Sequence, residues 1–193
     1  MLAARGWLVP ATYQQICAYE SDVCQPGTAG EIPAALRRPL HFPVLRPGAA
    51  CPTTPGHLLT TSNGGGGMAL GNGPVRPLIA MSGDLRHGVT DVTRADGQLS
   101  FKTDWTSLPS YQGPFVVRAT PLGRPGTIAF SFDTAPMVVP LVVPAGPTLN
   151  GTDGWRDAPG DTSVKTPGCY AWQIDGLTFS EIIVFRTGRI FPH

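Results

Sequence analysis

The residues that decide the fold are CYAWQIDG at positions 169–176, followed by FSEIIVF at positions 179–185. Every second residue within the first run is large and apolar: Tyr170, Trp172 and Ile174. This period of two is typical of a β-strand with one apolar face, whereas a helix repeats every 3.6 residues. The Asp175-Gly176 pair at the end of the run is a hairpin-turn sequence. The stretch therefore predicts two neighbouring antiparallel strands.

The second run alternates in the same way, except that Glu181 shares the face of Phe179, Ile183 and Phe185. Short apolar runs separated by turn sequences recur from residue 51 onward. They predict about eight strands: Leu58–Thr61, Pro77–Met81, Leu99–Lys102, Phe115–Thr120, Thr127–Phe132, Met137–Val143, Cys169–Asp175 and Phe179–Arg186. We therefore expect an all-β fold, an Ig-like sandwich of two antiparallel sheets.

Composition also favours strands and turns. The 193 residues include 24 Gly and 21 Pro but only two Lys and three Glu, so the usual residues of exposed helices are scarce. The length suits one domain, which we place at residues 51–193. Residues 1–50 are interpreted as an irregular, Pro-rich arm with a short helix over residues 11–20. Its residues 36–43 are expected to be extended, lying across the sandwich or pairing at its edge.

Charge and hydropathy exclude two classes of partner. The net charge of +1 gives no basic surface for nucleic acid. No apolar run approaches the roughly 18 residues of a membrane span. Residues 1–10 lack the apolar segment of a signal peptide, so no export signal is visible in this chain.

Four cysteines, Cys17, Cys24, Cys51 and Cys169, allow three disulfide pairings. The first two lie close together in a polar, turn-rich segment, and the other two each stand at the edge of an expected strand. We predict the pairs Cys17–Cys24 and Cys51–Cys169, and with them an exported protein of the extracellular space or cell envelope. Four reduced, buried thiols are the alternative. A zinc site is disfavoured, because the chain has no C-x-x-C and no His at zinc-finger spacing.

Two motifs carry a resemblance to known proteins. One is RRPLHFP at residues 37–43 with Cys51-Pro52, and the other is PGCYAWQIDG at residues 167–176 with FSEIIVF. Over residues 36–186 the chain resembles a loose group of exported bacterial β-sandwich proteins that end in a Cys-aromatic hairpin and have no assigned function. The resemblance implies a bacterial, exported protein and supports the Cys51–Cys169 pair. The chain departs from the group in lacking a visible signal peptide or lipobox.

Catalysis by an activated nucleophile needs a base held by an acid. No G-x-S-x-G motif is present. The candidate bases are His57 and His87, with an acid from the region of Asp84–Asp104, Asp84 first. The alternative is that both histidines are ordinary loop residues.

Three aspartates spaced by four, Asp153, Asp157 and Asp161, lie in a stretch rich in Gly and Pro and are candidates for Ca²⁺. The spacing does not match an EF-hand, and Asp commonly bonds to its own main chain in turns. We therefore assign no metal and no cofactor.

Three aromatic residues, Trp105, Tyr111 and Trp155, sit in polar or turn-rich segments, whereas Trp172 belongs to an apolar row. Aromatic rings on loops stack against sugar rings or anchor a protein partner. We predict a ligand-binding role for these three; the alternative is that they cover the ends of the sheets.

These observations favour a non-catalytic exported domain, a binding or structural component of the bacterial cell surface or extracellular space. Its partner would be a surface polymer or a protein. One alternative is a secreted hydrolase with a non-standard His/Asp site. Another is a self-assembling structural subunit, a homo-oligomer that docks the N-terminal arm on a neighbour.

Overall fold

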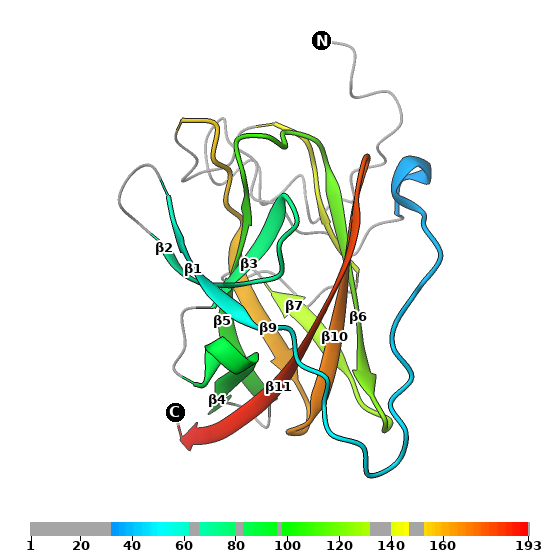
Figure 1. Cartoon of the computed structure of the whole chain (residues 1–193), viewed down its shortest axis with the longest axis vertical. Helices are drawn as coiled ribbons and strands as arrows, with labels where there is room; N and C mark the ends of the chain where they lie inside the picture. The colour runs from blue at the N-terminus through cyan, green and yellow to red at the C-terminus, as the bar shows by residue number, and fades with distance from the viewer. Residues whose placement is uncertain are drawn as a thin grey trace.

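The computed structural model describes residues 32–61, 66–79, 83–95, 98–131, 140–146 and 153–192. Over these residues the chain is all-β, as predicted. The strands are β1 (Gly56–Thr60), β2 (Gly66–Leu70), β3 (Val75–Ile79), β4 (Val89–Ala95), β5 (Gln98–Ser107), β6 (Phe115–Leu122), β7 (Ile128–Ser131), β8 (Leu141–Val143), β9 (Pro159–Val164), β10 (Cys169–Gly176) and β11 (Ser180–Pro192). There are also two single-turn 3₁₀ helices: η1 (Ala34–Leu36) lies before β1, and η2 (Leu85–His87) lies between β3 and β4 (Figure 1).

The strands form one continuous hydrogen-bonded sheet in the order β1-β2-β3-β5-β4-β11-β10-β6-β8. Strand β9 pairs with both β5 and β7. The long β5 has three partners: β4 pairs with residues 98–100, β3 with residues 103–107 and β9 with residues 99–104. The pairing of β4 with β11 is parallel. An Ig-like sandwich of two separate sheets is therefore not confirmed, because strand pairing continues from β5 through β4 to β11 within one sheet.

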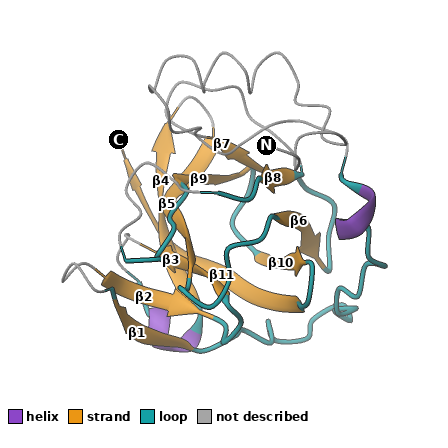
Figure 2. Ribbon diagram, turned by 90° about the horizontal axis from the view of Figure 1, so that it is seen from above, coloured by secondary structure: helices purple, strands orange, loops and turns teal. Residues whose placement is uncertain are grey.

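The sheet folds over on itself and encloses an aromatic core. Figure 2 shows β5 and β9 on one side of the interior and β6 and β10 on the other. Trp105 of β5 and Trp172 of β10 meet edge to face across it, with ring centroids 5.2 Å apart. Trp172 also stacks on Phe185 of β11 at 4.1 Å. Such contacts stabilise the fold by about 0.5–1.5 kcal/mol per pair beyond the burial of area.

The eight expected strands all coincide with observed ones in the described residues, but three further strands were missed. These are β2, β4 and β9. Strand β9 begins Pro159-Gly160-Asp161, which reads as a turn. It is a strand because β5 and β7 pair with it on both sides. Tertiary pairing here overrides the local preference.

The predicted turn at Asp175-Gly176 is wrong in its position. β10 and β11 do form the predicted antiparallel hairpin. Asp175, however, pairs with Ser180 inside the ladder and is completely buried. The chain reverses over the residues after it, where the main-chain N–H of Gly176 donates to the carbonyl of Phe179 at 3.0 Å.

The described part of the arm, residues 32–50, lies across the outer face of β6, β10 and β11, the face turned away from the core (Figure 1). Leu36 is fully buried against Val116 of β6 and Val142 of β8. Further along, Phe42 and Leu45 pack on a second apolar cluster of Leu122, Cys169, Ala171 and Val184. The predicted helix over residues 11–20 lies outside the described residues.

The predicted Cys51–Cys169 disulfide is present and joins the end of the arm to the start of β10, with the two Cα atoms 5.6 Å apart. The predicted Cys17–Cys24 pair lies outside the described residues. Within the described part of the chain, no helix is long and apolar enough to cross a membrane.

Candidate functional site

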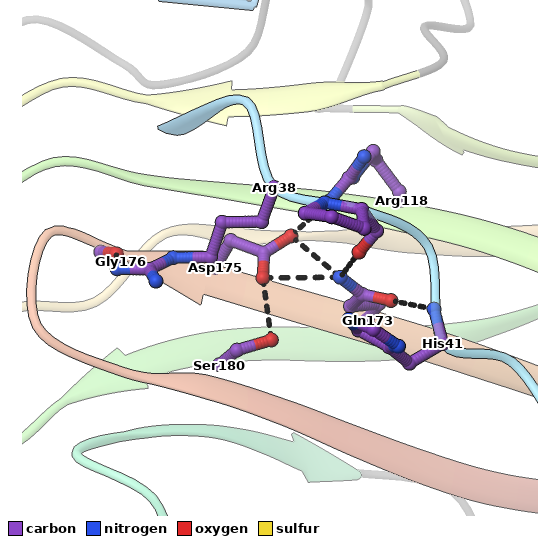
Figure 3. Close-up of polar contacts among 8 residues, drawn as sticks. Arg38, His41, Arg118, Gln173, Asp175, Gly176 and Ser180 are labelled. Atoms are coloured by element: carbon purple, nitrogen blue, oxygen red, sulfur yellow. Dashed lines mark hydrogen bonds and ion pairs between the residues drawn. The ribbon is translucent and has the colours of Figure 1, made fainter. Parts of the chain in front are cut away.

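A cluster of polar side chains lies on the outer face of β10, under the arm (Figure 3). Alternation along β10 sends Tyr170, Trp172 and Ile174 into the core, and so turns Gln173 and Asp175 to the opposite face. The ladder places Arg118 of β6 opposite Gln173, and Ser180 of β11 opposite Asp175. Residues directly opposite each other in antiparallel strands share a face, so these four side chains converge.

The carboxylate of Asp175 is the centre of the cluster. It is fully buried, and a charge in that position is costly unless it is paired and hydrogen-bonded. Arg118 supplies the opposite charge through its Nη2 atom. The hydroxyl of Ser180 donates to Oδ1 at 2.6 Å, and the amide of Gln173 donates from 3.1 Å. These donors satisfy both oxygens of the carboxylate.

The amide of Gln173, also fully buried, forms hydrogen bonds with the main chain of the arm. Its Nε2 atom donates to the carbonyl of Pro39 at 2.8 Å, and its Oε1 atom accepts from the N–H of His41 at 2.8 Å. Nε2 also donates to the carboxylate of Asp175, and this hydrogen bond fixes the orientation of the Gln173 amide. A single side chain therefore binds the main chain on both sides of Leu40.

Arg38, the residue before Pro39, makes a second polar contact between the arm and the domain. The guanidinium of Arg38 donates to the carbonyls of Gly176 and Leu177, at 3.0 and 2.8 Å, in the β10–β11 turn. The cluster as a whole holds an extended segment by its main chain, with apolar anchors at Leu36, Phe42 and Leu45 on either side.

The predicted catalytic residues lie elsewhere. His87 and Asp84 do pair, with Nδ1 2.8 Å from a carboxylate oxygen, but at η2 their side chains are 77% and 62% exposed. Asp84 lines an open surface pocket of about 580 Å³, together with Asp91, Arg189 and other residues. His57 is not part of this pair; its Nε2 atom lies 3.2 Å from Nη1 of Arg76.

Asp91 in this pocket has a structural partner. The ladder between β4 and β11 is interrupted after Thr187, which frees the N–H of Arg189. The buried carboxylate of Asp91 accepts that N–H at 2.9 Å and the guanidinium of the same residue at 3.0 Å. The carboxylate thus closes an irregularity in the sheet.

The three candidate calcium ligands lie in different local settings. Among the described residues, no group of three or more His, Cys, Asp or Glu side chains is placed to hold a metal. Asp153 is exposed in a turn with φ of 51°, whereas Asp161 belongs to β9. Asp157 acts instead on a neighbouring carboxylate: burial, reinforced by the charge of Asp157, raises the pKa of Asp104 to about 7.

The predicted binding aromatics are also placed differently. Trp105 is not on a loop; it lies in β5, is 1% exposed and packs in the core. Tyr111 is buried as well, and its hydroxyl donates to the carbonyl of Pro114 and accepts the N–H of Leu177 at 2.9 Å. Trp155 is partly buried against the cluster of Leu59, Ala69 and Leu78. Trp105 and Tyr111 therefore present no ring to a ligand at the surface.

Sequence reasoning missed the cluster around Asp175, although one signal for it was present. Gln173 and Asp175 are polar residues at alternate positions of a strand whose other row is wholly apolar. Such a row is normally solvated, and only the arm, more than a hundred residues earlier in the chain, buries it.

Comparison of the chain with protein-family models, with curated proteins and with solved structures finds no match.

Proposed function

We propose that the chain is a non-catalytic, exported domain that serves as a binding or structural component of the bacterial cell surface or extracellular space. The observation that carries this proposal is the Cys51–Cys169 bridge between the arm and β10. Structural disulfides persist in oxidising compartments and are rare in the cytosol. The bacterial source rests on the resemblance of residues 36–186 to exported bacterial proteins.

The polar cluster supports a binding or structural role rather than a chemical one. Catalytic groups need a reacting atom within hydrogen-bond reach. Asp175 and Gln173 are fully buried, and their polar atoms are already engaged with other parts of the chain. What the cluster does is to hold one segment of chain against another.

The test is the redox state and location of the protein in its native source. Cells are fractionated, and each fraction is alkylated under denaturing, non-reducing conditions before peptide mapping by mass spectrometry. We expect the protein outside the cytoplasm, with Cys51 and Cys169 joined. Free thiols on protein recovered from the cytoplasm would refute export.

A second candidate, the secreted hydrolase, is favoured by one observation: His87 is hydrogen-bonded to Asp84, and Asp84 lines an open pocket. The purified protein would be assayed on ester, peptide and glycan substrates. A hydrolase at this site requires turnover that His87→Ala abolishes and that the matched control His57→Ala leaves intact. Turnover unaffected by both substitutions would exclude this site.

The third prediction, a self-assembling subunit, concerns residues 1–50. Residues 32–50 pack on their own domain, and residues 1–31 lie outside the described part of the chain. The way in which residues 32–50 are held suggests a specific form of this assembly.

A further inference from the structure

We propose that the outer face of β6, β10 and β11 is a recognition site for an extended, proline-containing segment, and that residues 36–45 of a second copy of the chain can occupy it. In the monomer the site holds the chain's own residues 36–45. Exchange of this segment between two copies would give a symmetric dimer in which each arm lies on its partner's face. The inference deepens the proposed function by naming a partner.

The site is built before the segment arrives. Arg118 and Ser180 hold the Asp175 carboxylate, which in turn accepts the Nε2 hydrogen of Gln173. The amide therefore presents its oxygen and its second N–H hydrogen in a determined orientation. A preorganised site binds more tightly, because little conformational entropy is lost on binding.

The ligand class follows from the contacts. Gln173 binds the carbonyl of residue 39 and the N–H of residue 41, so it recognises an extended main chain. Leu40, between them, is 56% exposed and contributes no specificity. Specificity comes from the apolar anchors Leu36, Phe42 and Leu45. Proline at 39 and 43 favours the extended conformation and lowers the entropy cost of binding. A second copy carries all of these features at the required spacing.

The arm can leave its face without disrupting the sheet. Among the described residues, the main chain of residues 39–50 forms no hydrogen bond with the main chain of a strand. Residues 46–50, which join the segment to Cys51, are all exposed, and Gly48 has open space around it. This short stretch is a suitable hinge. Exchange of an identical element between protomers is a low-cost route to a dimer, because every contact is regained in the partner.

The experiment uses two complementary full-length variants. The first carries Leu36→Asp and Phe42→Ser, which release its arm but leave its face intact. The second carries Ala171→Phe, which enlarges a side chain of the cluster on which Phe42 and Leu45 pack and so blocks the face, but leaves the arm intact. We expect each alone to be monomeric by sedimentation velocity. A mixture at about 0.2 mM of each should form a heterodimer, in which the arm of the second variant binds the open face of the first. In the wild type the chain's own tethered arm, at millimolar effective concentration, would compete for that face; in the first variant it does not.

The matched control replaces the first variant with Leu40→Ala, whose change lies on the exposed side of the segment. This copy keeps its own arm docked, so it should stay monomeric when mixed with the Ala171→Phe variant. Two folded monomers that fail to associate in the first mixture would overturn the proposal. Equal association in the control mixture would also overturn it, because the contact would then lie outside this face.

A second measurement avoids substitutions in residues 36–45 and in the face that they cover. A protease site is placed within residues 47–50 of the full chain, and the nicked protein is incubated with a labelled synthetic peptide of residues 36–45. We expect the peptide to replace the cleaved segment. The same peptide N-methylated at His41 should bind at least tenfold more weakly, because it cannot donate to Gln173. Equal binding by the methylated peptide would refute recognition through this amide.

The identity of the occupant is tested with a third peptide. It keeps Pro39 and Pro43 but has serine in place of the three apolar anchors. Weaker binding supports a second copy as the partner, whereas equal binding would show that any proline-containing segment suffices. A bridged, exported protein that fails all these tests would refute arm exchange and leave the proposed function standing. Free thiols in the native protein would refute the proposed function and leave arm exchange to be judged by the binding tests alone.

Discussion

At the scale of single residues, the pairing of Arg118 with the fully buried Asp175 is costly to break. Replacing Asp175 with Asn should leave the Arg118 guanidinium, which is 15% exposed, without a counter-charge. Loss of one partner of a buried ion pair typically costs about 3–5 kcal/mol. We expect a loss of that size in the free energy of unfolding, measured by urea denaturation at pH 7. Ser180→Ala, which removes one neutral donor to the carboxylate, should cost less, about 1.5–3 kcal/mol.

The double variant with Asp175→Asn and Arg118→Met tests the cause. If the cost of the single change arises from a stranded charge, removing that charge should restore part of the stability. The double variant would then be more stable than the sum of the two single losses predicts. Strict additivity would show that the two groups do not interact.

Asp104 makes stability depend on pH in the opposite sense to an ordinary carboxylate. Burial and Asp157 raise its pKa from 3.8 to about 7 in the folded protein. Between these values the folded state holds a proton that the unfolded state has lost, so this group makes folding less favourable as pH rises from about 4 to about 7. Asp104→Asn removes the effect. We expect equal stabilities at pH 4 and a variant that is more stable at pH 8, by at most about 4 kcal/mol.

Urea denaturation at both pH values measures this difference, with Asp153→Asn as an exposed control that should follow the wild type. A gap between Asp104→Asn and wild type that is the same at pH 4 and pH 8 would contradict the assignment.

At the scale of elements, Glu181 links β11 to the turn between β2 and β3. The sequence marks it only as a charged exception on an apolar face. In the structure its two carboxylate oxygens accept the N–H groups of Asn72 and Gly73, at 2.6 and 3.0 Å. Main-chain donors in a turn form a natural anion site, which a carboxylate from the same chain occupies here.

Removal of this carboxylate should loosen one turn and leave the rest of the sheet unchanged. We expect Glu181→Ala to cost about 1–2 kcal/mol and to speed amide hydrogen exchange at Asn72 and Gly73. Glu181→Gln, which keeps one acceptor oxygen, should be intermediate. Unchanged exchange at both amides in the alanine variant would show that the turn stands without Glu181.

The sequence predicts an element well where the local pattern carries the information. The row of Tyr170, Trp172 and Ile174 needs only a window of six residues to identify a strand. Trp105 was wrongly predicted as a binding residue because the stretch of sequence considered around it was too short. Leu99, Phe101 and Trp105 lie on one inward face of β5, although its sequence looks polar. A longer window with a period of two would have identified it as core.

The site is hidden from sequence reasoning for a different reason. Gln173 and Asp175 look like the solvated row of a strand, and their burial depends on a segment more than 120 residues away. The hydrogen bonds between the Gln173 amide and the main chain of Pro39 and His41 cannot be inferred from spacing along the chain. The Pro-rich pattern predicted an extended arm that crosses the sandwich or pairs at its edge, but not which face of the domain it covers.

At the scale of the whole molecule, one sheet encloses the core, and the arm packs on the outer face of three of its strands. The Cys51–Cys169 bridge joins the arm to this sheet. The bridged residues are 118 positions apart. A cross-link over a loop of this length removes much of the entropy of the unfolded chain, which corresponds to about 4–5 kcal/mol in the chain-entropy model. Cys51→Ser combined with Cys169→Ser should lower the free energy of unfolding by up to that amount.

The site of this loss distinguishes two roles for the bridge. If it acts on the unfolded chain, the folded variant keeps its arm in place, and amide exchange at His41 rises only in proportion to the lost global stability. If it holds the arm down, exchange at His41 and proteolysis within residues 46–50 accelerate while the core strands stay protected. Since Gln173, Arg38 and the buried Leu36 anchor the far end of the arm independently of the bridge, we expect the first pattern. The second would mean that the bridge controls whether the segment is free to exchange.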